Sequence, residues 1–195
     1  MILGITGGTG SGKTTLLDVI REQGGSVLDC DRIYHRLLQT DKALLQTIED
    51  RFPGTVEKGS LNRKKLGSIV FADKTALEDL NRITHSAVKE EVLCKLEGES
   101  KLTAIDAIGL FEGGLAELCD VTVAVTAPLD TRIQRLMARD GISQEYAANR
   151  IAAQHQDAWF REKCDYVLCN DGAMDDFRAK CLAFLRGLGI MKENQ

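Results

Sequence analysis

The sequence predicts an α/β protein in which a parallel sheet is covered by helices on both faces. Short apolar runs alternate with longer segments whose apolar residues recur at spacings of three and four. The runs are apolar at consecutive positions, which is typical of strands buried on both faces of a parallel sheet. A chain of 195 residues is long enough for one such domain with an insertion.

The amino-terminal part predicts two strands and one helix. Residues 1–6 form an apolar run that ends in glycines, as expected of a buried strand. A helix then extends over residues 13–23 and is stopped by the following pair of glycines. Residues 26–30 predict the second strand, which carries Asp29 and Asp31 at its carboxyl end.

The next stretch, residues 32–97, is expected to be helical throughout, because its apolar residues keep the helical spacing. Two turn sequences, at residues 52–54 and 58–60, divide it into shorter pieces. It is too long for a simple crossover between parallel strands. We therefore expect an inserted helical subdomain at residues 32–98.

The remainder of the chain predicts three more strands separated by helices. Apolar and β-branched runs mark the strands, which are expected at residues 102–108, 121–126 and 167–169. The helices are expected at residues 130–139, 143–155 and 174–187. Ser143 is expected to be the N-cap of the second of these helices.

The composition excludes several classes of protein. Lys and Arg number 25 against 29 Asp and Glu, and the resulting charge of −4 argues against a nucleic-acid scaffold, which needs surplus basic residues. No signal peptide is visible, and no apolar run approaches the roughly 18 residues that cross a bilayer. The six cysteines form no Cys-x-x-Cys pair, which favours reduced structural thiols over a metal site or disulfides. We expect a cytoplasmic protein without membrane or nucleic-acid partners.

A phosphate-binding loop is the strongest motif. Residues 7–14 match the pattern G-x-x-x-x-G-K-[ST] and lie between the first strand and the first helix. The glycines let successive backbone N–H groups point at one anion, and the helix amino terminus adds partial positive charge. Lys13 can bridge the β- and γ-phosphates, and the Thr14 hydroxyl can ligate Mg²⁺. The alternative is a glycine-rich turn that happens to precede a helix.

Two classes of nucleotide-binding protein, the GTPases and the large mechanochemical ATPases, do not fit this sequence. No Asn-Lys-x-Asp segment for guanine recognition is present, and the chain is too short for a large mechanochemical ATPase. A small phosphotransferase is the class that best fits these observations.

Acidic residues follow two predicted strands, at the edge where such sheets bind ligands. Asp29 and Asp31 would point to the same side of a strand, so both carboxylates could face one cleft. Asp31 could accept a proton from an attacking hydroxyl or cap the next helix, and the residues alone favour neither role. Asp106 could assist Mg²⁺, directly or through water, or be a strand-end turn residue. Glu112 either lines the cleft or is solvated.

Arginines recur along one face of the helix predicted at residues 130–139, namely Arg132, Arg135 and Arg139. Arg150 and Gln154 follow on the next helix. Such a stripe is by itself typical of a solvated helix face. Beside a phosphate loop it suits a lid that closes over a triphosphate and excludes water.

The isolated histidines His35, His85 and His155 are interpreted as packed or surface residues when taken alone. Trp159 and Phe160 favour a packing anchor over a platform for base stacking.

Taken together, these segments resemble the dephospho-CoA kinase family over nearly the whole chain. The resemblance rests on residues 6–14, 28–35, 81–85, 135–143 with Arg150 and Gln154, and 165–172. It implies a three-layer P-loop NTPase fold with a five-stranded parallel sheet, a helical substrate-binding insertion and a small helical lid. The implied nucleotide-binding core comprises residues 1–31 and 99–195, the insertion residues 32–98, and the lid residues 130–156.

The resemblance also implies an activity. The γ-phosphate of ATP, accompanied by Mg²⁺, would be transferred to the ribose 3′-hydroxyl of dephospho-CoA, giving CoA and ADP in the last step of coenzyme A synthesis. ATP and dephospho-CoA are the implied partners, with no obligatory protein partner. Asp31 would be the catalytic base, assisted by Lys13 and Arg139. The implied ATP contacts are Gly10, Ser11, Gly12, Lys13, Thr14, Thr15, Arg139 and Asn170. The implied acceptor contacts are Asp31, His85 and Glu112, and the implied metal contacts are Thr14 and, through water, Asp106.

Two departures from the family pattern lie on the acceptor side. Ser86 stands where the family commonly has proline, and residues 108–112 stand where it commonly has Pro-Leu-Leu-x-Glu. Two other functions stay open. A nucleoside or nucleotide kinase of the same architecture would differ in its acceptor, and a nucleotide-dependent switch would need neither the paired acids nor the arginine lid.

Overall fold

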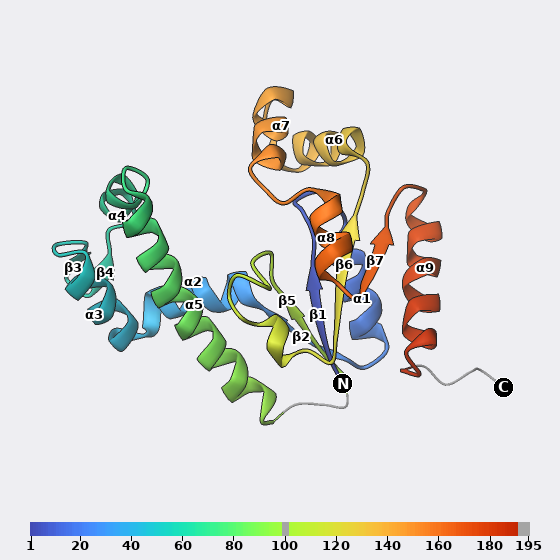
Figure 1. Ribbon diagram of the computed structural model, residues 1–195, viewed down its shortest axis with the longest axis horizontal. Coiled ribbons are helices and arrows are strands. Elements are labelled where there is room, and N and C mark those ends of the chain that lie inside the picture. The colour runs from blue at the N-terminus through green and yellow to red at the C-terminus, as the bar shows by residue number, and fades with distance from the viewer. Residues whose placement is uncertain (99–101, 191–195) are drawn as a thin grey trace.

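A five-stranded parallel sheet forms the centre of the computed structural model, which describes residues 1–98 and 102–190. Its strands are β1 (Ile2–Thr6), β2 (Ser26–Asp29), β5 (Thr103–Asp106), β6 (Val121–Thr126) and β7 (Tyr166–Cys169). Their order is β2-β5-β1-β6-β7 (Figure 1). Because β1 is the central strand, the phosphate loop that follows it starts in the middle of the carboxyl edge of the sheet.

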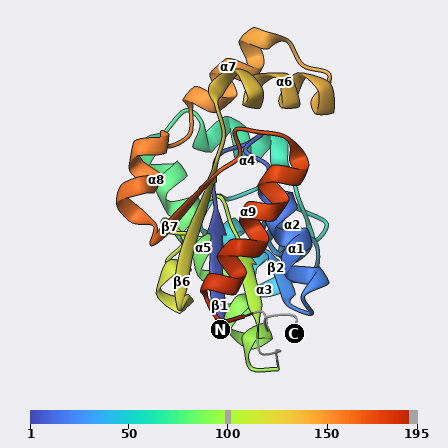
Figure 2. The same ribbon diagram turned by 90° about the vertical axis from the view of Figure 1, so that its right-hand side faces the viewer.

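Helices cover both faces of this sheet, as the apolar runs predicted (Figure 2). On one face, α1 (Lys13–Glu22) and α9 (Met174–Gly187) pack against alternate residues of β1 and β6, among them Ile5 and Val123. On the other face, Ala124 packs against Phe160 of α8 (Asp157–Lys163). Burial on both faces explains why the strands are apolar at consecutive positions.

The segment between β2 and β5 forms a separate lobe on one side of the sheet (Figure 1). It contains α2 (Cys30–Thr40), α3 (Lys42–Arg51), α4 (Arg63–Val70), α5 (Lys74–Leu96) and a hairpin of β3 (Val56–Glu57) and β4 (Ser60–Leu61). The prediction of helix throughout is therefore wrong at the hairpin. Lys58 and Gly59 both have positive φ, 53° and 77°, as a two-residue hairpin turn requires. Strands of two residues are too short to show an alternating pattern.

Two helices after β6, α6 (Leu129–Asp140) and α7 (Gln144–Ala152), project beyond the carboxyl edge of the sheet. They pack on each other through a small core of Ile133, Leu136, Ala147 and Ile151. The Ser143 side chain accepts a hydrogen bond from Tyr146 N at 3.2 Å, which confirms it as the N-cap of α7. The helix predicted to reach residue 155 stops at Ala152, and α8 begins at Asp157.

Within residues 1–98 and 102–190, no helix is both long and apolar enough to cross a membrane.

Candidate active site

The loop between β1 and α1 keeps the amino terminus of α1 open. Gly12 is the N-cap of α1, has φ of 93°, and offers no capping side chain. At Gly7, with φ of 137°, a Cβ would lie 2.2 Å from the Val125 carbonyl oxygen, so only glycine fits there. The backbone N–H groups of the first turn of α1 and the helix dipole therefore point at a place where an anion can bind.

The first part of this loop is held from outside by Arg132 and Gln154. Arg132 Nε donates to Thr9 O at 2.9 Å, and Thr9 N donates to Gln154 Oε1 at 2.8 Å. Arg132 Nη2 also donates to Gln154 Oε1 at 3.3 Å. Arg132 is only 5% exposed, and burial lowers the pKa of its guanidinium. The arginine stripe is therefore divided, because Arg132 supports the loop from behind instead of lining the cavity above it.

The second part of the loop is held by Arg135 and Asn170. Arg135 Nη1 donates to the carbonyls of Gly10 and Ser11, each at 3.2 Å, and Asn170 Nδ2 donates to Ser11 O at 2.9 Å. Asn170 is buried, and its Oδ1 accepts from Arg135 Nη2 at 3.3 Å. Asn170 thus contacts the loop itself, and its contact with ATP stays a prediction.

Lys13 and Asp106 face each other beside the loop, because β5 pairs with β1 in a register that sets Asp106 opposite Ile5. Lys13 Nζ lies 3.2 Å from Asp106 Oδ1, and the two side chains are 16% and 19% exposed. Burial raises the pKa of Asp106, although the Lys13 charge acts in the opposite direction. The aspartate therefore ends a strand at the loop, as its place in the sequence suggested.

Two residues of the loop region have side chains of the kind that a magnesium ion would need. The Thr14 hydroxyl and the Asp106 carboxylate offer oxygen, which Mg²⁺ prefers. Among the described residues, no group of three or more His, Cys, Asp or Glu side chains is placed to hold a metal ion. Such a site suits an ion whose remaining ligands are water and phosphate oxygens, as in other nucleotide sites.

A cavity of about 660 Å³ lies over the phosphate loop. Residues 8–14 form one side, and Arg135, Arg139 and Arg150 of the α6–α7 pair line the other. Arg139 Nε and Arg150 Nη1 both contact the Asp140 carboxylate, at 2.7 Å and 2.8 Å. The hydrogen bonds to Asp140 raise the pKa of Arg139, so its guanidinium stays charged. Thr15 lies in the first turn of α1 and does not line this cavity.

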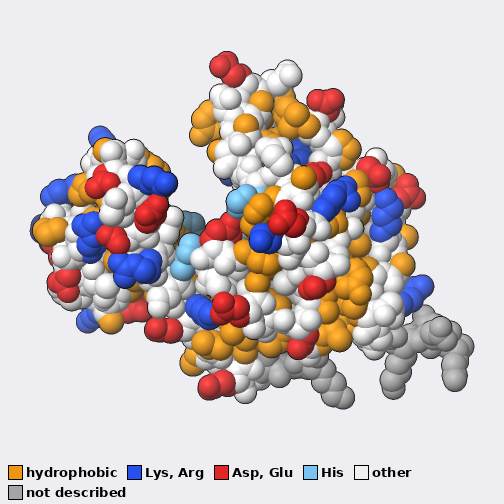
Figure 3. All heavy atoms as spheres, in the orientation of Figure 1, with side chains coloured by type: hydrophobic (Ala, Val, Ile, Leu, Met, Phe, Trp, Pro, Cys, Tyr) orange, Lys and Arg blue, Asp and Glu red, His pale blue; other side chains and the backbone are white. Residues whose placement is uncertain are grey.

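A second cavity, of about 230 Å³, lies between the lobe and the segment after β5. Its apolar lining includes Tyr34, Leu80 and Val88, and its polar lining includes Asn81 and His85. Figure 3 shows the surface hollowed between the lobe and the α6–α7 pair, with histidine side chains at the margin. Tyr34 and Asn81 lie in the family-like segments 28–35 and 81–85, but the sequence singles out neither of them as a site residue.

Asp31 lies where the two cavities meet, since it lines both of them together with Ile108. The prediction that Asp29 and Asp31 share one side of a strand is wrong, because β2 ends at Asp29 and the helix α2 begins at Cys30. Asp29 is the N-cap and accepts a hydrogen bond from Arg32 N at 2.9 Å. The capping role left open for Asp31 therefore belongs to Asp29, and the exposed carboxylate of Asp31 is available to the cavities.

Cys30, between these two aspartates, is buried. Burial and the nearby carboxylates raise the pKa of its thiol to about 12, so it is not a thiolate nucleophile at neutral pH.

Glu112 does not line the second cavity, and its Oε1 lies 2.6 Å from His155 Nε2. The His155 ring stacks on Trp159 with centroids 3.7 Å apart. Phe160 is 3% exposed, which confirms its packing role. The contact between Glu112 and His155 joins residues 43 apart in the chain, and no local pattern predicted it.

Comparison with known proteins is consistent with this geometry. The family model for dephospho-CoA kinase matches residues 1–176. A dephospho-CoA kinase from Brucella melitensis is 37% identical over 192 residues, covering 96% of this chain and 95% of the relative. One from Latilactobacillus sakei is 31% identical over 191 residues, covering 95% of both chains.

Solved structures agree with the sequence relatives. A crystal structure from Thermus thermophilus has a TM-score of 0.80 at 34% identity and covers 96% of this chain and 97% of its own. A dephospho-CoA kinase from Campylobacter jejuni has a TM-score of 0.70 at 26% identity, over 97% and 98% of the two chains. A shikimate kinase from Acinetobacter baumannii, at 16% identity and a TM-score of 0.54 over 97% and 95% of the chains, shares the fold alone.

Proposed function

The chain belongs to the dephospho-CoA kinase family, and on that premise we propose which of its residues carry out the reaction. It is an ATP-dependent kinase that phosphorylates dephospho-CoA. This reaction is the last step of coenzyme A synthesis. The proposal is that Asp31 is the general base and that the two cavities hold the two substrates. The observation that carries it is the position of Asp31 on the boundary of both cavities.

The triphosphate of ATP would lie over the phosphate loop. Backbone N–H groups at residues 10 and 12–14 and the Lys13 ammonium would hold its β- and γ-phosphates, as in other P-loop proteins. Arg139 and Arg150 line the same cavity and carry positive charge toward the transferring group. Thr14 and Asp106 would hold Mg²⁺, which neutralises charge on the phosphate oxygens when bound. In that state Lys13 would exchange Asp106 for phosphate as its partner.

The acceptor would occupy the second cavity. Its ribose 3′-hydroxyl would meet the γ-phosphate at the boundary, where Asp31 can accept the hydroxyl proton. His85 and Asn81 line this cavity and can bind polar groups of the acceptor. The small volume, about 230 Å³, suits part of dephospho-CoA and leaves the rest to the open groove beside the lobe.

The three predicted regions of the chain receive corresponding roles. The sheet and its covering helices would bind the nucleotide, the lobe at residues 32–98 would bind the acceptor, and residues 130–156 would close over the phosphates. The free thiols of all six cysteines support a reducing, cytoplasmic compartment. The lack of an obligatory protein partner stays a prediction.

Identification of the product tests the acceptor directly. The protein is incubated with Mg²⁺–ATP and dephospho-CoA, and parallel samples contain a panel of nucleosides and nucleotides instead. Mass spectrometry should show CoA and ADP, with the new phosphate on the 3′-oxygen. A phosphorylated nucleoside without CoA would indicate the nucleoside kinase alternative. Hydrolysis of ATP without any phosphorylated acceptor would indicate a switch.

Replacement of Asp31 tests the base. Asp31→Asn should lower kcat at least about a hundredfold, the usual scale of general-base catalysis. ATP binding should be nearly unchanged, because Asp31 lies outside the phosphate loop. Asp29→Asn is the matched control, since asparagine caps a helix as well as aspartate does. A near-normal kcat in Asp31→Asn would remove the assignment. Equal losses in both variants would point to damage to α2.

A further inference from the structure

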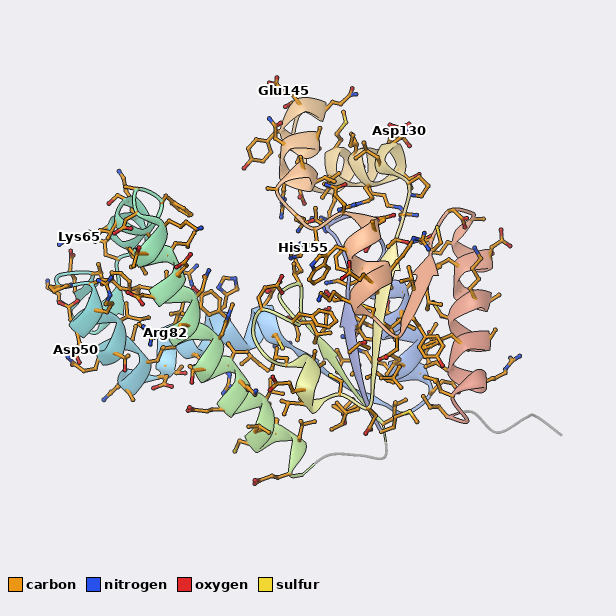
Figure 4. All side chains as sticks on the ribbon, viewed as in Figure 1. Asp50, Lys65, Arg82, Asp130, Glu145 and His155 are labelled. Carbon is orange, nitrogen blue, oxygen red and sulfur yellow. The ribbon has the colours of Figure 1, made fainter. Side chains whose placement is uncertain are left out.

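Two consecutive residues between α7 and α8 reach two different parts of the site. Gln154 Oε1 accepts from Thr9 N of the phosphate loop at 2.8 Å, and His155 Nε2 lies 2.6 Å from Glu112 Oε1. In Figure 4, His155 lies at the base of the α6–α7 pair, on the side of the groove, while Glu145 marks its far tip. We call residues 153–156 the α7–α8 linker. It connects the phosphate loop to the segment that carries Glu112.

The His155 ring has a fixed orientation. It lies parallel to the Trp159 ring, with centroids 3.7 Å apart and planes 3° apart, and it meets Phe160 edge to face. Trp159 in turn packs edge to face with Phe111, the residue before Glu112, with ring centroids 5.3 Å apart. Aromatic packing therefore aims His155 Nε2 at the Glu112 carboxylate, although both side chains are about 40% to 45% exposed.

Glu112 belongs to the segment that forms one wall of the second cavity. We call residues 107–115 the acceptor segment, because five of them line that cavity: Ala107, Ile108, Gly109, Gly113 and Leu115. The segment is held internally by hydrogen bonds from Gly113 N to Gly109 O and from Leu115 N to Leu110 O. Because these residues form a compact turn, a contact at Glu112 fixes the position of the whole wall.

We propose that His155 and Glu112 are positioning residues that hold the acceptor segment at a set distance from the phosphate loop. The inference rests on the proposed function, because it assigns the second cavity to the acceptor. Transfer requires the acceptor hydroxyl and the γ-phosphate to be within contact distance and aligned, so a small displacement of one wall lowers the rate. Gln154 contacts the phosphate loop and His155 contacts the acceptor segment, so one short stretch of backbone fixes the positions of both. Glu112 thereby acts on the acceptor through the segment and not by contact.

Steady-state kinetics of four variants test the positioning role of His155 and Glu112. Glu112→Ala removes the carboxylate, Glu112→Gln keeps an oxygen that can accept from His155, and His155→Phe keeps the stacking on Trp159 but removes the nitrogen. Glu117→Gln is the control, because Glu117 is also an exposed, paired glutamate after β5, with its Oε2 2.8 Å from Lys89 Nζ, but lies outside the acceptor segment.

Glu112→Ala and His155→Phe should raise KM for dephospho-CoA or lower kcat about three- to tenfold, the scale of one ordinary hydrogen bond, while KM for ATP stays unchanged. Glu112→Gln should recover most of the activity. The double variant Glu112→Ala/His155→Phe should be no worse than the poorer single variant, since both remove the same contact. Additive losses, or a wild-type KM and kcat in Glu112→Ala, would overturn the proposal. A lower Tm without a kinetic change would show a purely structural contact.

Amide hydrogen exchange of the ligand-free protein separates this inference from the proposed function. Glu112→Ala and His155→Phe should exchange faster than wild type at residues 109–116, and Glu117→Gln should not. If the two variants exchange faster but the wild-type protein makes no CoA, the positioning contact between His155 and Glu112 stands and only the identity of the acceptor is refuted. Unchanged exchange in both variants would refute the positioning role of His155 and Glu112, even if CoA is made.

Discussion

Gly8 occupies a variable position of the phosphate-loop motif, yet the structure leaves no room there for a side chain. A Cβ at Gly8 would lie 2.1 Å from Arg132 Nη2 and 2.7 Å from its Cζ. The ends of arginine side chains are usually flexible, but Arg132 is 5% exposed and its guanidinium donates hydrogen bonds to Thr9 O and Gln154 Oε1. In Gly8→Ala it must move, and the hydrogen bonds that hold the loop are lost or distorted.

The size of this effect follows from those two hydrogen bonds. A hydrogen bond with a charged donor contributes about 1.5–3 kcal/mol, and the one at 3.3 Å is the weaker. Gly8→Ala should therefore lower the free energy of unfolding by about 2–4 kcal/mol. For a chain of this size that lowers Tm by roughly 5–15 °C. ATP affinity should also fall, because the Thr9 peptide loses its anchors.

Thermal unfolding and ATP titration measure both effects, and Gly187→Ala is the matched control. A Cβ at Gly187, in the last turn of α9, meets no atom within 4 Å, so that variant should be stabilised by about 0.4–1 kcal/mol. In an Arg132→Ala background, Gly8→Ala should add little further loss, because the obstructing side chain is gone. A Gly8→Ala protein with wild-type Tm and ATP affinity would refute the reasoning.

Two further predictions concern ionisable groups. Burial raises the folded-state pKa of Asp106 above its unfolded value, so its contribution to stability is full below the unfolded pKa and is lost as pH rises through the folded pKa. The Tm of Asp106→Asn relative to wild type should therefore rise as the pH increases from 4 to 8, because the variant lacks the carboxyl group whose contribution is lost over that range. Mg²⁺–ATP activity should fall, and a relative Tm that stays constant between pH 4 and pH 8 would contradict the raised pKa. Iodoacetamide at pH 8 should modify the exposed Cys94 much faster than the buried thiols. Burial raises the pKa of the thiol to about 12 at Cys30 and to about 11 at Cys181. Peptide mass spectrometry measures the order of modification, and a result in which Cys30 is modified first would contradict this prediction.

The sheet and the phosphate loop could be predicted because their signals are local. A strand buried on both faces is apolar along its length, and the loop needs glycine where φ is positive, as at Gly7 and Gly12. The sequence also indicated that acids would follow β2 and β5 at the edge of the sheet. Each of these features depends on residues within one turn or one strand, so the order of residue types is sufficient.

The division of roles between Asp29 and Asp31 could not be read in the same way. The strand predicted at residues 26–30 ends one residue earlier, at Asp29. That end point decides that the Asp29 carboxylate caps α2 and that the Asp31 carboxylate faces the cavities. Arg132 and Arg139 likewise share a predicted helix face, but one is buried behind the loop and the other lines the cavity. The direction of a side chain along a helix is set by the helix, whereas its burial is set by what packs against it.

By itself, then, the sequence determined the buried parallel strands, the anion-binding loop and the family to which the chain belongs. Only the tertiary structure decided which side chains support the loop, that Asp31 lies between two cavities, and that His155 meets Glu112. The reason is distance along the chain. Thr9 and Gln154 are 145 residues apart, and such contacts form only when the packing of helices on the sheet brings their backbones together.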